Sequence, residues 1–277
     1  MSNYTQVLYE TADGIGTITT NRPNVRNAQS RVLLEEMDDA FGRAARDPGV
    51  RVIVLRGSGD HFSGGHDLGT PDELADRKAR PAAEGLRGRY GRSWDLYVDA
   101  TLRWRNVPKP TIAAVQGYCI FGGWMIASAC DVIIAADDAL FLPTNFQYFS
   151  VPWDMHPRKA KAILFESRLV DAREAEDLGF VTWVVPRAKL DAEVAAYAGR
   201  VAENDPFQLR MIKLAINQAQ EAQGFTSHIY GAHALHMLSS TGESDPGYAL
   251  QKPEGRQRPM VQRAFENYER RKAARGE

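Results

Sequence analysis

Twenty consecutive residues without a charge, 111–130 (TIAAVQGYCIFGGWMIASAC), constrain the fold of this 277-residue chain more than any other feature. A run of this length is about long enough to cross a bilayer. Gly117 and the pair Gly122-Gly123 divide it into a short β-branched piece and a short helical piece, and Asp131 follows at once. We therefore expect a buried strand, a turn and a buried helix inside a globular protein, with a membrane helix as the distant alternative.

Runs with strand character alternate with helical patterns over the first two thirds of the chain. The strand-like runs are short and apolar, whereas the helical stretches repeat their apolar residues every three or four positions. Buried strands separated by helices indicate a parallel sheet built from crossover connections. The predicted strands are 6–10 and 15–20, joined as a hairpin, then 51–55, 111–115 and 131–136; the predicted helices are 31–45 and 72–105, the latter with a break near Pro81.

The chain after Pro152 is predicted to be mostly helical. Its helical patterns leave room for one strand, 181–185, and the C-terminal stretch is a charged helix with an apolar side. Such a helix covers either its own core or a neighbouring subunit. The helical patterns span 158–166, 172–178, 189–203, 206–222 and 258–277.

Composition argues against several classes of protein. The chain is 44% hydrophobic and 25% charged, which is ordinary for a globular protein, and its formal net charge is −1. So small a net charge gives no general attraction for nucleic acid, and we expect none as a partner. Cys119 and Cys130 lie in apolar sequence without metal-ligand spacing. We therefore expect buried free thiols, no metal, and a reducing, cytoplasmic setting.

Two glycine-rich turns, FSGGHDL at 62–68 and FGGWMIA at 121–127, each follow a predicted strand. Glycine in a helix costs roughly 1 kcal/mol relative to alanine, so a compensating gain is expected. A turn of small residues before a buried helix exposes backbone N–H groups, to which the helix dipole adds partial positive charge. Two such turns facing one point would form an oxyanion hole. Either turn alone is explained more simply by tight packing or by a plain connection.

In four segments the chain resembles the crotonase, or enoyl-CoA hydratase/isomerase, superfamily. The resemblance covers most of residues 6–205 in the family's order, and it implies a substrate that is an acyl-coenzyme A thioester, with no separate cofactor. The segments are GIGTITTNRPNVRNAQS (14–30), VRVIVLRGSGDHFSGGHDL (50–68), KPTIAAVQGYCIFGGWMIASACDVIIAADDALF (109–141) and AREAEDLGFVTWVVP (172–186).

The fold implied by this resemblance is α/β, a crotonase-like spiral of ββα repeats with two roughly perpendicular sheets and a helical C-terminal part. Residues 1–205 would form the core with the acyl-CoA site. Residues 206–277 would form a C-terminal helical region for trimerisation or for a lid. The implied assembly is a homotrimer or a dimer of trimers.

The resemblance assigns the two oxyanion donors to the backbone N–H groups of His66 and Gly122. His66 stands where the family has a small residue, and we expect its side chain to face solvent, the alternative being the ligand. Arg26 matches the basic position that approaches the coenzyme A phosphates, or is an ordinary surface arginine. The other residues assigned to the coenzyme A side are Ala28, Gly64, Gly65, Asp67 and Leu68.

One departure from the family concerns proton transfer. Its hydratases use two glutamates, and the matching positions hold Met125 and Asn145, whose side chains do not exchange protons near neutral pH. Relatives that shift double bonds, displace aromatic halide or cleave β-diketones carry a carboxylate near position 154. Asp154 is therefore the first candidate for the acid/base group. Trp153 beside it would, with Met125 and Asn145, line the substrate pocket.

The loop around Asp154 also offers His156 and Tyr148 as candidate catalytic groups. A desolvated carboxylate has a raised pKa, which suits a general base. The alternative role for Asp154 is the N-cap of the following helix, and that for His156 is a solvated loop residue.

The implied function is that of an acyl-CoA enzyme of the enoyl-CoA hydratase/isomerase type, a lyase or isomerase of fatty acid metabolism. Proton transfer would have moved from the glutamate pair to the 148–156 loop. Double-bond isomerisation, hydration by an altered route and C–C cleavage of a β-diketone all pass through the same oxyanion. The alternative from another class is a catalytically silent acyl-CoA-binding or assembly subunit, which Met125 and Asn145 motivate.

Overall fold

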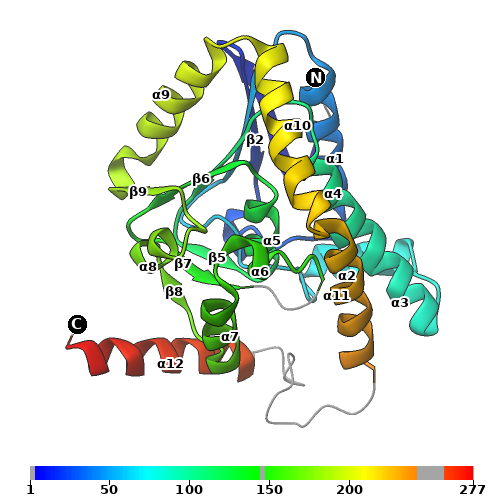
Figure 1. Cartoon of the computed structure of the whole chain (residues 1–277). Coiled ribbons are helices and arrows are strands. Elements are labelled where there is room, and N and C mark those ends of the chain that lie inside the picture. Colours follow the sequence, from blue (N-terminus) through cyan, green and yellow to red (C-terminus); the bar gives the residue numbers. More distant parts are fainter. Residues whose placement is uncertain (1–3, 144–146, 242–258, 277) are drawn as a thin grey trace.

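The computed structural model describes residues 4–143, 147–241 and 259–276, which form two β-sheets surrounded by helices (Figure 1). The larger sheet has the strand order β1-β2-β3-β4-β6-β9. β1 and β2 form an antiparallel hairpin and every following pair is parallel, so both predictions are confirmed. The strands are β1 (Val7–Ala12), β2 (Ile15–Thr20), β3 (Val52–Gly57), β4 (Thr111–Val115), β6 (Val132–Ala136) and β9 (Trp183–Val185).

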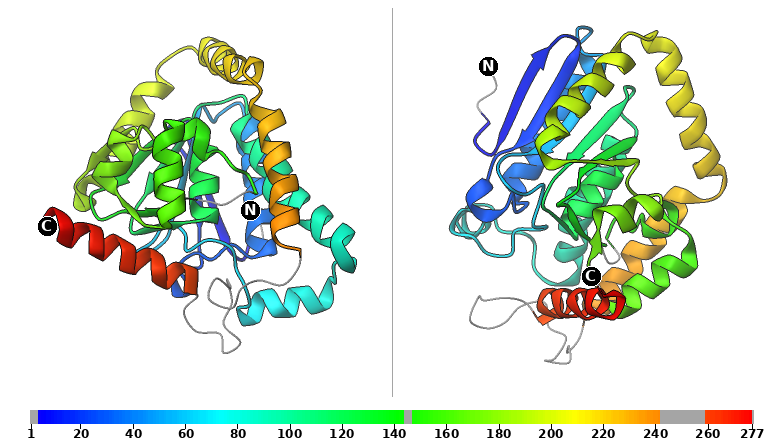
Figure 2. Two further views of the ribbon diagram at one scale, coloured as in Figure 1. Left: turned by 60° about the horizontal axis from the view of Figure 1, so that its bottom comes forward. Right: turned by 90° about the vertical axis from the view of Figure 1, so that its left-hand side faces the viewer.

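Side chains of the central strands alternate between two apolar layers. In β3, Ile53 and Leu55 pack in the layer that contains α1 (Arg31–Arg46), whereas Val52 and Val54 pack in the layer that contains α9 (Leu190–Ala202). Helices therefore cover both faces of the sheet, as Figure 2 shows. Because both faces are buried, the strands are apolar along their whole length.

The uncharged run becomes β4, then β5 (Tyr118–Ile120), then α5 (Gly122–Ser128). This confirms the predicted strand at 111–115 and the buried helix, whereas β5, which lies between them, was not predicted. β5 begins the second sheet, whose order is β5-β7-β8, with β7 at Leu140–Leu142 and β8 at Val170–Asp171. Within the three described ranges, no helix is long and apolar enough to cross a membrane.

The strand β8 adds to the single strand predicted after Pro152. Two residues are too few to carry a periodic pattern, so the sequence gave no signal for β8. The predicted helices of this part are present as α7 (Pro157–Glu166), α8 (Ala172–Asp177), α9 and α10 (Pro206–Ala222), preceded by the short α6 (Val151–Asp154). One-turn 3-10 helices lie at Pro23–Val25 and Arg187–Lys189.

The region predicted as a broken helix over 72–105 consists of α2 (Pro71–Ala79), α3 (Gly85–Ser93) and α4 (Ala100–Arg105). Between α3 and α4, residues Trp94–Asp99 are π-helical. Short π-helical stretches are rare and frequently lie at functional sites. This one carries Tyr97 to the glycine turns.

The C-terminal helices are α10, α11 (Phe225–Ser239) and α12 (Pro259–Arg275). α12 lies across its own second sheet, next to α7 (Figures 1 and 2). Ala264 packs with Ile120, Leu142 and Leu169 in one apolar cluster. Of the two possibilities for a charged terminal helix, the structure therefore shows coverage of its own core.

Candidate functional site

The two glycine turns lie side by side. Ser63 and Cys119 form a parallel bridge, in which the Ser63 amide donates to the Tyr118 carbonyl (2.8 Å) and the Ile120 amide donates to the Ser63 carbonyl (3.0 Å). Gly65 follows in the first turn with φ +90°, and a Cβ there would lie 2.8 Å from the carbonyl oxygen of Ile120. Glycine is therefore required by both conformation and space, and it lets the first turn approach the second.

Gly122 begins α5 where the second turn meets the first. A Cβ on Gly122 would lie 2.8 Å from two ring atoms of His66. The Gly122 N–H belongs to the first turn of α5, so it lies outside the hydrogen bonds of the helix. Phe121 precedes it with φ +46°, a strained conformation for a residue with a Cβ, and the Phe121 amide donates to the Leu142 carbonyl (2.9 Å).

The backbone of His66 runs beside Gln29. The Gln29 amide donates to the Gly65 carbonyl (2.8 Å), and the Asp67 amide donates to the Gln29 carbonyl (2.9 Å). Since successive N–H groups of an extended segment point to opposite sides, the N–H of His66 points away from Gln29. The two candidate donors thus come from turns that touch, and neither is used in the backbone pairing with Gln29 or within α5.

The side chain of His66 is turned into the protein, and the expectation that it faces solvent is wrong. Its ring is half-buried against Tyr97, with centroids 4.0 Å apart, and its Nε2 lies 2.5 Å from Oε1 of Gln147. The π-helical stretch places Tyr97 there, and Gly122 leaves room for the ring. Sequence reasoning missed this contact because it joins four segments far apart in the chain.

Met125 and Tyr148 meet in one closed apolar cluster. Both are fully buried, and they pack with Val98, Leu102, Phe225 and Ile229. Burial raises the pKa of Tyr148 well above its ordinary value, and its hydroxyl has no hydrogen-bond partner in the described part of the chain. Tyr148 therefore keeps its proton at any pH near neutrality. Asn145 lies outside the described residues.

Asp154 is the last residue of α6, and its carboxylate is held by two neutral donors. Oδ2 accepts hydrogen bonds from the indole N–H of Trp124 (2.8 Å) and from the hydroxyl of Ser150 (2.7 Å), which itself lies 2.9 Å from the hydroxyl of Ser128. Burial raises the pKa of Asp154 to about 6, although both hydrogen bonds act in the opposite direction. The raised pKa expected from its surroundings is therefore present.

The alternative role of Asp154, an N-cap, is wrong. His156 caps α7, because its Nδ1 accepts a hydrogen bond from the Arg158 amide (3.3 Å). His156 is exposed in this capping position, so the structure does not bring it to the glycine turns. Trp153 does join the cluster of Met125 and Tyr148: its indole N–H donates to Nδ1 of His228 (3.0 Å).

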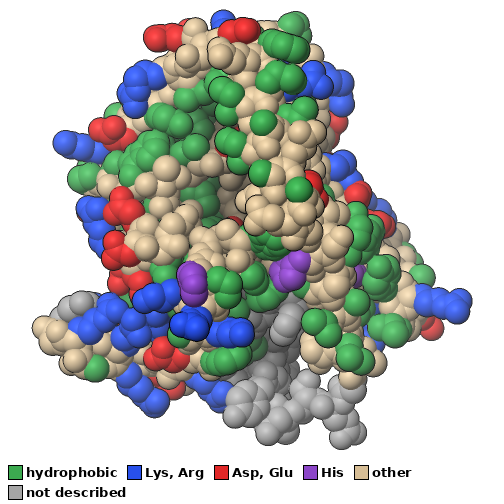
Figure 3. Space-filling view, in the orientation of Figure 1, with side chains coloured by type: hydrophobic (Ala, Val, Ile, Leu, Met, Phe, Trp, Pro, Cys, Tyr) green, Lys and Arg blue, Asp and Glu red, His purple; other side chains and the backbone are tan. Residues whose placement is uncertain are grey.

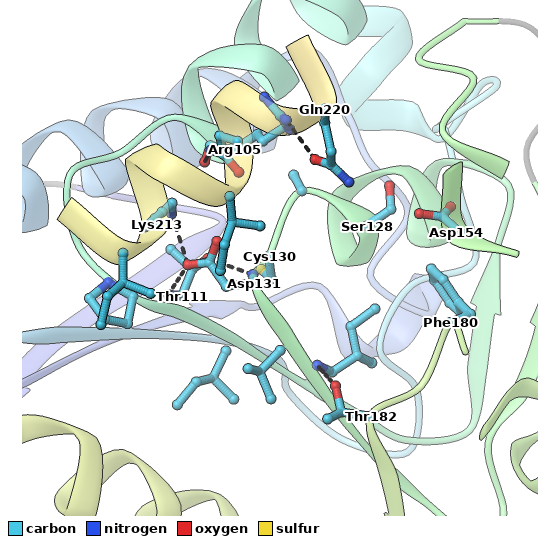
Figure 4. A pocket seen from close by; sticks show the side chains of 18 of the residues that line it. Arg105, Thr111, Ser128, Cys130, Asp131, Asp154, Phe180, Thr182, Lys213 and Gln220 are labelled. Atoms are coloured by element: carbon cyan, nitrogen blue, oxygen red, sulfur yellow. Dashed lines mark hydrogen bonds and ion pairs between the residues drawn. The ribbon is translucent and has the colours of Figure 1, made fainter. Parts of the chain in front are cut away.

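Beside Asp154 lies a cleft of about 530 Å³ between α10 and the N-terminal ends of β4 and β6. Figure 4 shows Asp154 at its border together with Ser128 and Phe180. The other charges in Figure 4 are engaged: Lys213 pairs with Asp131 (2.8 Å), and Arg105 donates to Gln220 (2.7 Å). The apolar walls include Ile112, Ile133, Tyr197, Ile212 and Ile216.

The residues assigned to the coenzyme A side separate into two kinds. Arg26 is exposed, with its guanidinium 5.9 Å from the ring centre of Tyr118, and Gly64 packs against it. Asp67 is buried and pairs with Arg22 (2.7 Å). Burial alone would raise its pKa, but hydrogen bonds from Thr70, Gly69 and Arg22 hold the pKa of Asp67 below its ordinary value.

Asp67 therefore holds its loop in place through internal contacts. Ala28 takes part in the same network, since its carbonyl accepts from Arg22 (2.5 Å). Leu68 is half-buried and Gly65 is buried beside Gly122. Sequence reasoning missed Arg22 and Trp124, which orient Asp67 and Asp154; both lie in the quoted segments, but nothing in the sequence shows which carboxylate each one contacts. Among the described residues, no group of three or more His, Cys, Asp or Glu is placed to hold a metal ion.

Comparison with known proteins gives one consistent result. The family model for enoyl-CoA hydratase/isomerase matches residues 10–249. EchA13 of Mycobacterium tuberculosis, named as an enoyl-CoA hydratase, is 36% identical over 254 residues, which are 84% of this chain and 80% of that protein. A Mycobacterium smegmatis structure titled as an enoyl-CoA hydratase has a TM-score of 0.77 at 44% identity, covering 84% of this chain and 93% of the other. The structure of an enoyl-CoA hydratase/isomerase from Xanthobacter autotrophicus Py2 has a TM-score of 0.80 at 35% identity. The match covers 87% of this chain and 90% of the other.

Proposed function

Because the chain belongs to the enoyl-CoA hydratase/isomerase family, we propose that it acts on an acyl-CoA thioester whose carbonyl oxygen accepts hydrogen bonds from the N–H groups of His66 and Gly122. The observation that carries this proposal is the contact between the two glycine turns, each of which tolerates only glycine at its centre. Amides fixed in this way stabilise the negative oxygen of an enolate, and each such donor contributes about 3 kcal/mol of transition-state stabilisation. Coenzyme A enters as part of the substrate.

The chemistry differs from hydration by a glutamate pair. Met125 occupies the first glutamate position inside a closed apolar cluster, and a thioether neither donates nor accepts a proton. A reaction that shifts a double bond needs a proton removed beside the thioester carbonyl and a proton delivered further along the acyl chain. Isomerisation is therefore the leading reaction.

Asp154 is our candidate for a proton carrier. Its pKa of about 6 lets it change charge near neutral pH, which general acid/base catalysis requires. It is anchored to the same helix as the oxyanion donor, because its partner Trp124 stands two residues after Gly122. His156 caps α7 and Tyr148 keeps its proton, so neither competes with Asp154 in this role.

The test is a panel of enoyl-, dienoyl- and 3-oxoacyl-CoA thioesters, with a free β-diketone added to cover C–C cleavage. We expect turnover of at least one 3-enoyl-CoA, and in Asp154→Asn a loss of about 100-fold or more in kcat with nearly unchanged affinity. Asp177→Asn, an exposed position on α8, is the control for the same loss of charge. Wild-type turnover by Asp154→Asn would remove Asp154 from the mechanism.

A second candidate function is an acyl-CoA-binding subunit without catalysis. It is favoured by the burial of both Met125 and Tyr148, because neither side chain offers a titratable group near neutrality. In that case acyl-CoA binds, as measured by calorimetry, but no thioester in the panel is converted.

For the assembly we propose a homotrimer or a dimer of trimers. Several large apolar side chains on α10 and α11 are exposed in the single chain, among them Phe207 (67%), Ile216 (60%) and Leu238 (72%). Figure 3 shows apolar side chains gathered in the hollow between α9 and α10. Light scattering on the purified protein tests this: we expect a trimeric or hexameric mass, reduced in Ile216→Glu, and a monomeric wild type would exclude both assemblies.

A further inference from the structure

The two oxygens of the Asp154 carboxyl group have different surroundings. Oδ2 accepts hydrogen bonds from the indole N–H of Trp124 (2.8 Å) and from the hydroxyl of Ser150 (2.7 Å), whereas Oδ1 accepts none within the described part of the chain. Asp154 also borders the cleft beside α10, as Figure 4 shows. Oδ1 is therefore the oxygen that is available to exchange a proton with a molecule in the cleft.

The position of Ser150 is fixed by the backbone of α6. Ser150 is 1% exposed, and its carbonyl accepts hydrogen bonds from the amides of Trp153 (2.6 Å) and Asp154 (3.1 Å). Side chains four residues apart on a helical turn lie on the same side, so the hydroxyl of Ser150 faces the carboxyl group of Asp154. The hydroxyl reaches Oδ2 from the place that its own backbone gives it.

Ser128, at the end of α5, completes a chain of hydroxyl groups. Its hydroxyl lies 2.9 Å from that of Ser150 and 2.9 Å from the carbonyl oxygen of Met125. A serine hydroxyl has one proton to donate, and a carboxylate only accepts, so the proton of Ser150 is directed to Asp154. Ser128 is then the donor whenever the two hydroxyls are bonded. A hydroxyl that accepts a hydrogen bond becomes a stronger donor, which strengthens the bond from Ser150 to Oδ2.

The same donors decide which oxygen carries the proton when Asp154 is neutral. An indole N–H donates and cannot accept. With the proton on Oδ1, Oδ2 is the carbonyl oxygen and keeps both of its hydrogen bonds. With the proton on Oδ2, Ser150 would have to turn its hydroxyl toward Ser128, and the indole N–H would face an O–H group. Only the first arrangement leaves every donor in place, so it is the favoured one.

No charged group among the described residues competes with these neutral donors. Burial raises the pKa of Asp154 to about 6, and the other influences on it are the hydrogen bonds from Ser150 and Trp124. The titratable groups around the cleft and the 148–156 loop are either paired with an opposite charge or uncharged near pH 7. They are the pairs Lys213–Asp131 and Arg105–Glu221, and the uncharged side chains Tyr148, Cys130 and His228.

We propose that Ser150 is a positioning residue for proton transfer by Asp154: its hydroxyl holds Oδ2 as an acceptor, so that Oδ1 takes and gives the proton. This inference rests on the proposed function, in which Asp154 is the proton carrier, and it names the atom that acts and the residue that selects it.

The proton is transferred in two steps at Oδ1. Oδ1 first takes it from the carbon beside the thioester carbonyl; the C–H electron pair becomes a C=C bond, and the carbonyl π pair moves onto the oxygen. The Oδ1–H bond of Asp154 then breaks, and its electron pair stays on the carboxylate. The far C=C pair of the dienolate forms the new C–H bond, the near C=C pair moves one bond along, and the oxyanion pair re-forms the carbonyl.

Difference infrared spectroscopy between about pH 5 and about pH 8, on either side of the pKa of Asp154, reads the hydrogen bonds of the protonated carboxyl group. The band of Asp154 is the one that is missing in Asp154→Asn. In Ser150→Ala the carbonyl oxygen loses a donor, so we expect its C=O band at a higher frequency than in wild type. Ser150→Thr keeps the hydroxyl and should retain the wild-type frequency. Ser227→Ala, at an exposed position on α11, is the control for the same loss of a hydroxyl.

The pH profile of kcat gives the second readout. Removing a hydrogen bond that favours the ionised carboxylate raises the pKa of Asp154. In Ser150→Ala we expect the limb of the profile that depends on Asp154 to move to higher pH by about one pH unit, with less than about threefold change in acyl-CoA affinity. A purely structural defect would lower the amount of active protein and leave the limb in place. Ser150→Cys, whose thiol is a weak donor, should give a smaller change in the same direction.

A wild-type C=O frequency in folded Ser150→Ala overturns the proposal, because the proton would then be on Oδ2. If Ser150→Ala does not fold, the same result in Ser150→Cys overturns it. An unmoved pH limb in the folded variant also overturns it, because Ser150 would then not act on the ionised carboxylate. Wild-type protein that converts no thioester of the panel overturns the proposed function, and with it the part of Ser150 in catalysis; the infrared band still decides which oxygen carries the proton.

Discussion

The indole N–H of Trp124 donates a hydrogen bond to Oδ2 of Asp154 at 2.8 Å, which ties the 148–156 loop to the helix that begins at Gly122. The donor is neutral, and no cation of the described residues acts on the carboxylate, which borders the cleft. This combination explains why burial is able to raise the pKa of Asp154 to about 6 while the carboxylate remains hydrogen-bonded.

Trp124→Phe should raise the pKa of Asp154 further. The hydrogen bond from the indole N–H stabilises the ionised carboxylate more than the protonated carboxyl. A hydrogen bond to a charged group contributes about 1.5–3 kcal/mol, which corresponds to roughly one pKa unit or more. The measurement is an NMR titration of the Asp154 carboxyl carbon, supported by the pH dependence of kcat. An unchanged pKa would mean that the indole contributes nothing to the ionised form. Phe141→Leu, another change in the same aromatic cluster, is the control for altered packing.

The raised pKa of Asp154 also makes stability depend on pH. The folded value is about 6 and the ordinary value is about 3.9, so the folded protein favours the protonated carboxyl. The stabilisation that the protonated Asp154 carboxyl gives the folded state is fully present below about pH 4. It is lost as the pH rises through 6, because the buried carboxyl then ionises. Asp154→Asn cannot ionise, so we expect it to be more stable than wild type at pH 8, by about 2–3 kcal/mol, and equal to wild type near pH 4. Urea unfolding at the two pH values measures this, and a variant that is less stable at pH 8 contradicts the assigned direction.

Gly122→Ala should impair both stability and activity. The new methyl group would meet the side-chain oxygen of Gln29 at 2.4 Å and the His66 ring at 2.8 Å, and such overpacking costs about 1–3 kcal/mol. Displacing the ring and the amide by a fraction of an ångström should lower kcat/KM by about 100-fold. Gly91→Ala on α3 is the matched control, since a Cβ there meets nothing within 4 Å. It should stabilise the protein by roughly 0.5–1 kcal/mol.

Asp67→Ala should be one of the most destabilising single changes near the site. It leaves the guanidinium of Arg22, 6% exposed, with only the exposed carboxylate of Asp72 at 3.6 Å as a charge partner, and breaking a buried pair costs about 3–5 kcal/mol. Thermal unfolding measures the loss. Arg173→Ala breaks an ion pair with Glu176 on the surface of α8 and should change stability by less than about 1 kcal/mol. Equal effects of the two changes would exclude a structural role for the buried pair.

Much of the fold was predictable because the relevant information is local. The alternation of apolar strands with helical patterns predicts the parallel sheet, and the glycines in the uncharged run predict β4 and α5, although not β5 between them. The break in 72–105 follows from Pro81 and its neighbours. The two-residue strand β8 and the π-helical turn at Trp94–Asp99 were not predictable, because each depends on the segments packed against it.

The candidate site divides in the same way. The sequence by itself determined where two turns of glycine would stand, because residue type and order suffice for that statement. Tertiary structure alone decided that the ring of His66 points inward, that Trp124 holds Asp154 and that His156 caps α7. Each of these depends on side chains from segments far apart in the chain that pack in the same small volume. The order of residues along the sequence does not show which of those side chains come into contact.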